Sequence, residues 1–187
     1  MYLSEKMRNF QQNQLMKYLS ILFLLLSLSA CEDPMKKQLA QVDPTHNWEN
    51  RKINVSTPDS LLTKGSTYLP VYSEIYQQNK NFTFNLTATV SIRNISLKDT
   101  IYIYKADYYD TYGTLIREYL DHPVYVQPME TIEIVVDEED EGGGTGANFV
   151  FDWATKKNKL EPFFEAVMIS TAGQQGLSFT TRGIRKK

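Results

Sequence analysis

The segment "FTFNLTATVSIR", Phe82 to Arg93, alternates apolar and polar side chains over its whole length. The apolar series begins at Phe82 and ends at Ile92, and Thr, Asn, Ser and Arg fill the positions between. Successive side chains of a β-strand point to opposite faces of the sheet. A period of two therefore predicts one long strand with a buried face and a solvated face.

The neighbouring segments predict more strands of this kind. "TIYIYKADYY" and "TLIREYL" flank "DTYG", where Asp110 and Gly113 favour a turn, so this segment predicts a β-hairpin. Other β-rich runs occur at similar spacing: "TYLPVYSEIY", "PVYVQP", "TIEIVV", "NFVFDW", "FFEAVMIS" and "GLSFTT". About nine short strands without a convincing amphipathic helix predict an all-β fold, a single antiparallel β-sandwich.

In "PFFEAVMIS" both faces are apolar, which is typical of a central strand, but Glu165 interrupts one face. Burying an isolated carboxylate costs several kcal/mol, so the side chain needs a partner. We expect an ion pair with Arg93 or Arg182. A functional carboxylate is the other interpretation, and together with Asp152 it would suit a hydrolase.

The first thirty residues resemble a leader for export. The chain is polar as far as Lys17, apolar from Leu19 to Leu28, and then small at Ser29 and Ala30. An apolar run of this length suits a signal-peptide core of about 7 to 15 residues, whereas a membrane span needs about twenty. The leader is long before the apolar run, so Met1, Met7 and Met16 are all candidate starts.

The only cysteine, Cys31, follows Leu28, Ser29 and Ala30, and this order resembles the bacterial lipobox. The resemblance implies that the thiol carries diacylglycerol, that the leader is cut before Cys31, and that an acyl chain such as palmitate blocks the new amino terminus. Two or more chains anchor a protein stably, whereas one binds only marginally. The alternatives are a free buried thiol or half of a disulfide, for which the chain has no second cysteine.

These patterns predict three parts: a signal peptide over residues 1–30, the lipidated cysteine and a polar tether over 31–66, and the sandwich over 67–187. Such a tether spans on the order of 30 Å and places the sandwich close to the lipid bilayer. We expect a bacterial cell envelope location, with inner membrane, outer membrane and cell surface all open. The formal net charge of −2 argues against nucleic acid, whose binding needs a basic face.

The segment "DEEDEGGGTGANFVFDW", Asp137 to Trp153, places five acidic residues before three glycines. Hard cations bind several oxygen ligands on a flexible loop, so Asp137, Glu139 and Asp140 are weak candidates for a Ca²⁺ site. The run lacks the spacing of an EF-hand, and a solvated hairpin tip is the simpler explanation for it. No cofactor is expected apart from this calcium alternative.

The tyrosine-rich hairpin and the glycine loop form the candidate binding surface. Its residues are Tyr108, Tyr109, Tyr112, Gly146 and Asn148. Tyrosine offers flat amphipathic area at low entropy cost, so a protein partner or an envelope polymer could bind there. Tyrosine is also a favoured strand residue, which is the simpler explanation for its abundance.

Enzyme motifs are absent from the sequence: it holds no "GxSxG" and no "HExxH", and its only histidines are His46 and His122. The residues therefore predict a non-enzymatic binding or accessory protein anchored in the envelope. A calcium-dependent module using Asp137 to Glu141 is the alternative, and a hydrolase using Glu165 is a third hypothesis.

Several segments resemble, in the same order, a bacterial family known only as domain of unknown function 3124. They are "YLPVYSEIY", "LTATVSIRN", "ADYYDTYGTLIREYL", "GGGTGANFVFDW", "EAVMIS" and "GLSFTTRG". The resemblance runs from Tyr68 to about Gly183, with Gly146 to Phe149 and Glu165 to Met168 among the matching positions. It implies an exported or lipidated bacterial protein, and it implies no established activity, cofactor or catalytic residue.

Overall fold

The computed structural model describes residues 16, 48, 50–171 and 176–186. The signal peptide expected over residues 1–30 and the lipidation expected at Cys31 lie outside this described part, apart from Met16. Residues 44–187 form one compact unit, and the fold described below belongs to it. Within the described residues, no helix is both long enough and apolar enough to cross a membrane.

The regular structure of residues 50–171 and 176–186 consists of twelve β-strands and two short 3-10 helices. The strands are β1 (Leu62–Pro70), β2 (Glu74–Gln77), β3 (Asn79–Asn85), β4 (Thr87–Arg93), β5 (Ile101–Tyr109), β6 (Leu115–Glu118), β7 (Val124–Val126), β8 (Thr131–Val136), β9 (Asn148–Lys156), β10 (Phe163–Ser170), β11 (Leu177–Arg182) and β12 (Ile184–Lys186). The 3-10 helices are η1 (Asp59–Leu61) and η2 (Gly144–Gly146). The all-β prediction is therefore confirmed, with more and shorter strands than expected.

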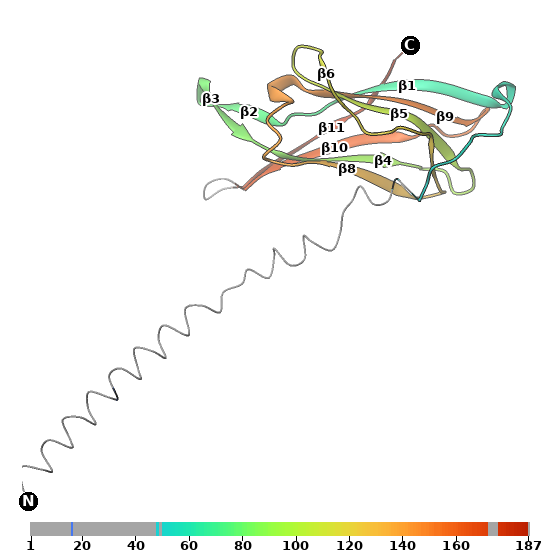
Figure 1. Ribbon diagram of the computed structural model, residues 1–187, viewed down its shortest axis with the longest axis horizontal. Coiled ribbons are helices and arrows are strands. Elements are labelled where there is room, and N and C mark those ends of the chain that lie inside the picture. Colours follow the sequence, from blue (N-terminus) through green and yellow to red (C-terminus); the bar gives the residue numbers. More distant parts are fainter. Residues whose placement is uncertain (1–15, 17–47, 49, 172–175, 187) are drawn as a thin grey trace, which may run out of the picture. The chain divides into compact units, whose positions relative to one another are not determined.

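Two antiparallel sheets form the layers of a sandwich (Figure 1). The larger sheet has the strand order β12-β1-β9-β5-β6, with β7 also pairing with β5, and the smaller sheet has the order β11-β10-β4-β8. Strands β2 and β3 pair with each other in a separate two-stranded ribbon at one end of the sandwich (Figure 1).

A stack of aromatic rings joins the two layers. Phe149 and Phe151 of β9 stack with centroids 5.5 Å apart, and Phe151 stacks at 4.7 Å on Phe164 of β10 in the opposite sheet. Full burial of a phenylalanine side chain stabilises the fold by about 1.5 to 3 kcal/mol. The alternation in "NFVFDW" directs these rings inward, as a period of two requires.

The long strand predicted from Phe82 to Arg93 is in fact two strands. The backbone N–H of Leu86, between β3 and β4, donates to the carbonyl oxygen of Ser73 at 2.8 Å, and the pairing partner changes there from β2 to β10 and β8. The prediction of a buried face is right for β4, where Ala88 and Val90 are fully buried. It is wrong for Phe82, which is 60% exposed. The reason is that β3 belongs to the ribbon.

Strand β10 is central in its sheet, as predicted, because it pairs with both β4 and β11. Its two faces differ, however. Phe164 and Met168 lie in the core, whereas Ile169 on the other face is exposed. A strand at the centre of a sheet can be apolar on both faces even when a second layer covers only one of them.

The folded unit includes residues that the sequence placed in the tether. Trp48 is buried in the core, and the guanidinium of Arg51 donates to both carboxylate oxygens of Glu130, at 2.5 and 2.6 Å. Strand β1 begins at Leu62, so the boundary expected at Ser66 lies inside it. The Pro-rich and charged composition of this segment suggested a tether, but Trp48 and Arg51 make it part of the folded unit.

Removing residues 1–53 will destabilise the sandwich more than removing residues 1–43, because only the first truncation deletes Trp48 and Arg51. We expect a loss of roughly 3 to 5 kcal/mol in the free energy of unfolding, which is typical of truncating a buried tryptophan. Urea denaturation of the two chains measures the difference. Trp48→Ala in the longer chain is the control and should reproduce most of the loss. Equal midpoints for all three proteins would show that this segment is dispensable.

Candidate functional site

Two loops that the sequence singled out separately meet at one end of the sandwich. Thr111 in the β5–β6 turn donates its backbone N–H and its hydroxyl to the carbonyl oxygen of Gly143, both at 3.0 Å. The backbone N–H of Gly146 donates back to Thr111 Oγ1 at 2.9 Å. We call this contact between residues 110–114 and 142–147 the loop junction.

The β5–β6 turn confirms the predicted hairpin and explains the residues "DTYG". Asp110 Oδ1 accepts the backbone N–H groups of Tyr112 and Thr114, at 2.8 and 2.7 Å. Gly113 has φ of +82°, a conformation that glycine adopts without steric cost. This geometry leaves Tyr112 at the tip of the turn, where it is 91% exposed.

The glycines of the second loop permit its close approach to the sandwich. A Cβ atom on Gly143 would stand 1.9 Å from the Tyr108 hydroxyl, and one on Gly144 would stand 2.7 Å from Thr111 Oγ1. Gly144 also has φ of +74°. The glycine run therefore serves to seat the loop on Tyr108 and Thr111.

Tyr108, expected on the binding surface, is fully buried, and this expectation is wrong. Its ring stacks on Phe149 at 4.7 Å, because Tyr108 faces inward on β5. Burial raises the pKa of its hydroxyl to about 12, an effect that the Ser73 hydroxyl opposes. Ser73 itself donates to the carbonyl oxygen of Gly144 at 3.2 Å. The Tyr108 hydroxyl makes no hydrogen bond of normal geometry in the described structure.

Tyr109 points to the opposite face of β5 and is half-buried. Its hydroxyl donates to Asp107 Oδ2 at 3.1 Å, and Lys105 Nζ lies 2.6 Å from the same oxygen. Burial raises the pKa of Tyr109, and the hydrogen bond to Asp107 raises it further. The Asp107 carboxylate raises the pKa of Lys105. Tyr109 is thus tied into a charged cluster, and Tyr112 is the tyrosine of this hairpin that faces solvent freely.

The acidic run is folded against its neighbours. The backbone N–H of Asp140 donates to the carbonyl oxygen of Asp137 at 2.9 Å, and Asp140 Oδ2 lies 3.0 Å from Arg117 Nη2 on β6. Glu141 Oε1 accepts a hydrogen bond from Asn85 Nδ2 at 3.3 Å. In the described part of the chain, no three acidic, His or Cys side chains are grouped so that they could hold a metal ion. The weak candidates Asp137, Glu139 and Asp140 therefore do not converge.

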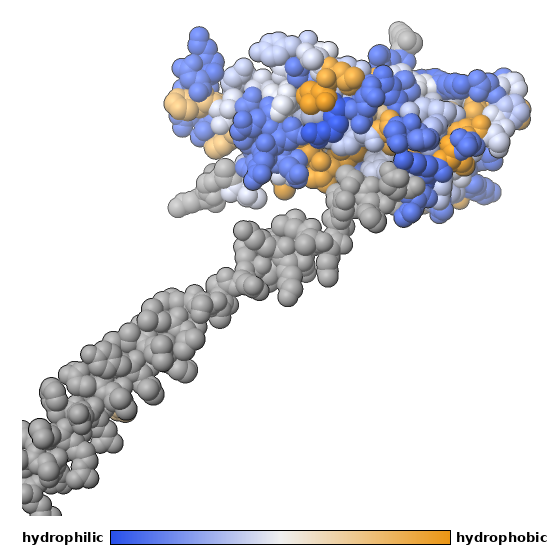
Figure 2. Space-filling model, in the orientation of Figure 1, coloured by the Kyte–Doolittle hydropathy of each residue, from blue (hydrophilic) through white to orange (hydrophobic). Residues whose placement is uncertain are grey.

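Exposed aromatic side chains lie on the elements that meet at the loop junction. Tyr76 on β2 is 62% exposed and Phe82 on β3 is 60% exposed, in addition to Tyr112. The ribbon that carries them is held at the junction by the bonds from Asn85 to Glu141 and from Ser73 to Gly144. Apolar side chains are visible at this end of the molecule in Figure 2. We call Tyr76, Phe82, Tyr112 and residues 142–147 the loop-end surface.

The sequence-based interpretation missed the ribbon. It placed Phe82 in the core and did not single out Tyr76. The polar run "QQNKN", residues 77–81, lies between two β-rich segments and was an available turn signal. Gln78 in this run has φ of +56°, as a tight turn between β2 and β3 requires. Of the other predicted residues, Gly146 lies in the loop junction, Asn148 begins β9 directly after it, and both are partly exposed.

The two carboxylates considered for a hydrolase lie on opposite sides of the sandwich. Glu165 Oε1 accepts from Arg93 Nε at 2.7 Å on the outer face of the smaller sheet, as expected for a structural ion pair. Asp152 lies between the inward-facing Phe151 and Trp153 on β9, so it points outward from the larger sheet. Two packed sheets are about 10 Å apart before side chains are counted. Glu165 and Asp152 therefore cannot act on one bond.

Comparison with known proteins gives a family and no activity. The model of a family described as "Protein of unknown function (DUF3124)" matches residues 64–185. No curated protein matches the chain. A Thermotoga maritima protein, described as "Crystal Structure of Thermotoga maritima 1070", is 10% identical, with a TM-score of 0.40. The match covers 64% of this chain and 92% of that one.

Gly143→Ala will place a methyl group where the Tyr108 hydroxyl already lies. We expect a loss of roughly 1 to 3 kcal/mol in the free energy of unfolding, as overpacking typically causes. Gly176→Ala is the matched control, because its added Cβ would meet only the Ser170 carbonyl oxygen at 3.7 Å. Chemical denaturation of both variants tests this. Equal stabilities would mean that the loop relaxes without cost.

Tyr108→Phe will leave stability at neutral pH unchanged or slightly raised, because it removes a buried hydroxyl that lacks a normal hydrogen bond. Above pH 10 the two proteins will diverge. The unfolded Tyr108 ionises near pH 10.0 and the folded one near 12, so the native state holds more protons in this window and the wild-type stability falls as pH rises. Denaturation at a series of alkaline pH values should show a shallower fall for Tyr108→Phe. Tyr112→Phe is the exposed control.

Proposed function

We propose that this chain, which belongs to the DUF3124 family of proteins of unknown function, is a bacterial envelope lipoprotein whose sandwich binds a partner without catalysing a reaction. The partner is a protein or an envelope polymer. The loop-end surface is the binding site, and the acylated Cys31 is the membrane anchor.

The anchor is supported by the order Leu28, Ser29, Ala30 and Cys31 behind a short apolar run. Only one cysteine is present in 187 residues, and it occurs where lipid attachment needs it. Since one acyl chain holds a protein only marginally, diacylglycerol together with an amide-linked chain such as palmitate would supply stable attachment.

The binding role is supported by one observation: three large exposed aromatic side chains lie on elements that meet at a hydrogen-bonded loop junction. Aromatic residues are enriched at protein interfaces, where they bury much apolar area at low entropy cost. Tyr76, Phe82 and Tyr112 come from three separate elements that hydrogen bonds hold together. A surface organised in this way binds a partner with little further ordering.

The ribbon favours a protein partner over a polymer. Strands β2 and β3 pair only with each other in the described structure, so the outer edge of each offers unpaired backbone groups. An extended peptide could add to either edge by backbone hydrogen bonds, with side chains contacting Tyr76 or Phe82. An isolated two-stranded ribbon is marginally stable, and such an addition would stabilise it.

The proposal of a non-enzymatic role is supported by the site chemistry. Glu165 is engaged by Arg93, and Asp152 is remote from it. Asp140 is engaged by Arg117. At the loop junction, the Thr111 hydroxyl and the Asp110 carboxylate are engaged by backbone groups of the two loops, so they position the turn that carries Tyr112.

A photo-cross-linking amino acid in place of Tyr112, in the full chain in its native bacterium, will test this. We expect a discrete adduct from position 112 and none from position 68, which lies on the outer face of the larger sheet. Adding Phe82→Ser should reduce the adduct roughly tenfold, as loss of an interface hot spot does, while changing stability by no more than about 0.5 kcal/mol.

The form of the adduct identifies the class of partner. A band of defined mass that protease removes indicates a protein, and a smear that a muramidase removes indicates the wall polymer. An adduct that forms only with Ca²⁺ and not with EDTA would favour the calcium-dependent alternative. Equal adducts from positions 112 and 68, or none from position 112, would contradict the loop-end surface as the binding site.

A further inference from the structure

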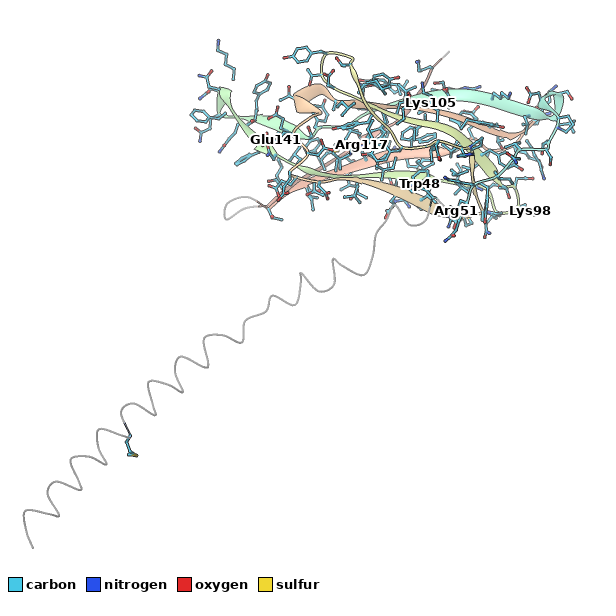
Figure 3. All side chains as sticks on the ribbon, viewed as in Figure 1. Trp48, Arg51, Lys98, Lys105, Arg117 and Glu141 are labelled. Atoms are coloured by element: carbon cyan, nitrogen blue, oxygen red, sulfur yellow. The ribbon has the colours of Figure 1, made fainter. Side chains whose placement is uncertain are left out.

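Apolar side chains also collect at the other end of the sandwich. Five of the fourteen large apolar side chains that are exposed in the described residues lie there: Leu61, Ile95, Leu97, Met129 and Leu160. Leu97 is the most exposed of them, at 77%. In Figure 3, Lys98 marks this end and Glu141 marks the loop end. Single exposed apolar residues are normal on a surface, but a cluster suggests an interaction.

Contacts between loops hold these residues together. The backbone N–H of Met129 donates to the carbonyl oxygen of Ser96 at 3.0 Å, which joins the β7–β8 turn to the β4–β5 loop. The N–H of Lys157 donates to the carbonyl oxygen of Leu61 at 2.8 Å. Ile95, Leu97 and Leu160 line a shallow depression of about 450 Å³. Together, Leu61, Ile95, Leu97, Met129 and Leu160 with Lys98 and Lys157 form what we call the anchor-end surface.

Met129 occupies a position that the backbone does not favour for it. The N–H of Glu130 donates to the carbonyl oxygen of Gln127, and Met129 in this turn has φ of +62°. Glycine or asparagine is the usual residue at such a position. The Met129 side chain is 63% exposed, so it contributes little to the stability of the sandwich. Its apolar character is better explained by contact with a surface outside the sandwich.

Positive charge exceeds negative charge among the side chains at this end. The nearby carboxylates have basic partners: Asp99 lies 3.3 Å from Lys156 Nζ and 3.5 Å from Lys159 Nζ, and Glu130 is held by Arg51. Lys98 and Lys157 have no ion pair among the described residues. The anchor-end surface therefore combines exposed apolar groups with uncompensated positive charge.

We propose that the anchor-end surface docks on the headgroup region of an anionic lipid bilayer. This inference rests on the proposed function, because the acylated Cys31 brings the sandwich to the lipid. Proteins bind membrane surfaces by inserting exposed apolar side chains such as Leu, Ile and Met while neighbouring Lys side chains contact the lipid headgroups. Each lysine near an anionic leaflet adds a modest attraction, which salt screens.

The path of the chain brings this end to the membrane. Arg51, which follows the buried Trp48, bonds to Glu130, the neighbour of Met129. Trp48 follows Cys31 by 17 positions. So few residues reach at most about 60 Å when fully extended, and a flexible coil of that length spans on the order of 25 Å. The tether thus holds the anchor-end surface at high effective concentration beside the lipid, and weak docking suffices.

Docking would orient the molecule. With one end on the lipid, the loop-end surface at the other end of the sandwich would face away from the membrane, where a partner can reach it. The lipid anchor alone limits the distance from the membrane but leaves the orientation free.

The test uses residues 32–187 with an amino-terminal histidine tag in place of the lipid. The tag attaches the protein to vesicles of phosphatidylcholine and phosphatidylglycerol that contain a nickel-chelating lipid. Without Cys31 the chain has no thiol, so Leu97→Cys carries one environment-sensitive fluorophore and Asn81→Cys on β3 carries the matched one. A nitroxide on the lipid headgroup should quench the fluorophore at position 97 and not the one at position 81. High salt, or omission of phosphatidylglycerol, should weaken the quenching.

A double variant tests whether the apolar and charged side chains of this surface cause the quenching. Leu160→Ser with Lys98→Glu should reduce quenching at position 97 roughly tenfold, whereas Leu177→Ser, which removes an exposed leucine of β11, should leave it unchanged. Equal quenching at positions 97 and 81, or none at position 97, would overturn the proposal. A dimer without vesicles that protects position 97 would overturn it too, because a second copy would then cover this surface.

Because the tagged chain carries no lipid, the vesicle assay tests docking independently of the proposed lipid anchor. Palmitate labelling of the full chain in cells, with Cys31→Ser as the control, reports on the lipid anchor alone. Labelling that survives Cys31→Ser, or its absence from the wild type, would contradict the anchor while the vesicle assay still reports on docking. Labelling that depends on Cys31, together with an unquenched fluorophore at position 97, would leave a lipoprotein whose sandwich stays off the membrane.

Discussion

The stack of aromatic rings along β9 is the interaction on which the rest of the structure depends. Phe151 contacts Phe164 across the two layers, and Phe149 contacts both Phe151 and Tyr108. Because these rings are rigid and fully or almost fully buried, they set the separation and alignment of the two sheets. Trp153 continues the inward face of β9, and its indole N–H donates to Thr67 Oγ1 at 2.9 Å. Strand β9 thus organises β1, β5 and β10 at once.

The same stack positions the loop end. Phe149 lies just after the glycine loop, and Tyr108 lies just before the β5–β6 turn, so one ring contact fixes the starting points of both loops. Gly143 then rests against the Tyr108 hydroxyl, and Thr111 joins the two loops by three hydrogen bonds. The ribbon attaches to this framework through Asn85 and Ser73. A binding surface placed on such loops inherits its rigidity from the core.

The two ends of the sandwich differ in charge and in the kind of apolar residue they expose. The loop end carries aromatic side chains beside an acidic run, and the anchor end carries aliphatic side chains and methionine beside lysines. Aromatic groups with polar tips suit a protein partner, whereas aliphatic groups with a basic rim suit lipid. The proposed division of labour, with the membrane at one end and a partner at the other, follows from this difference and from the end at which the tether joins the fold.

The amino-acid sequence by itself determined the fold class, the hairpin around Asp110 and Gly113, the central position of β10 and the need of Glu165 for an arginine partner, which the structure shows to be Arg93. These features depend on the alternation of apolar and polar residues, on turn-forming residues and on the need of a partly buried carboxylate for a basic partner. Each of them can be inferred from neighbouring residues or from simple pairing rules. Only the tertiary structure decided that the strand from Phe82 breaks at Leu86, that Tyr108 is core while Tyr112 is surface, and that Trp48 belongs to the folded unit. An alternating pattern gives the period of burial but not which sheet a strand joins, and a tyrosine or tryptophan can occupy core or surface equally well. Where the second layer ends, and what lies opposite each face, is a property of the whole chain.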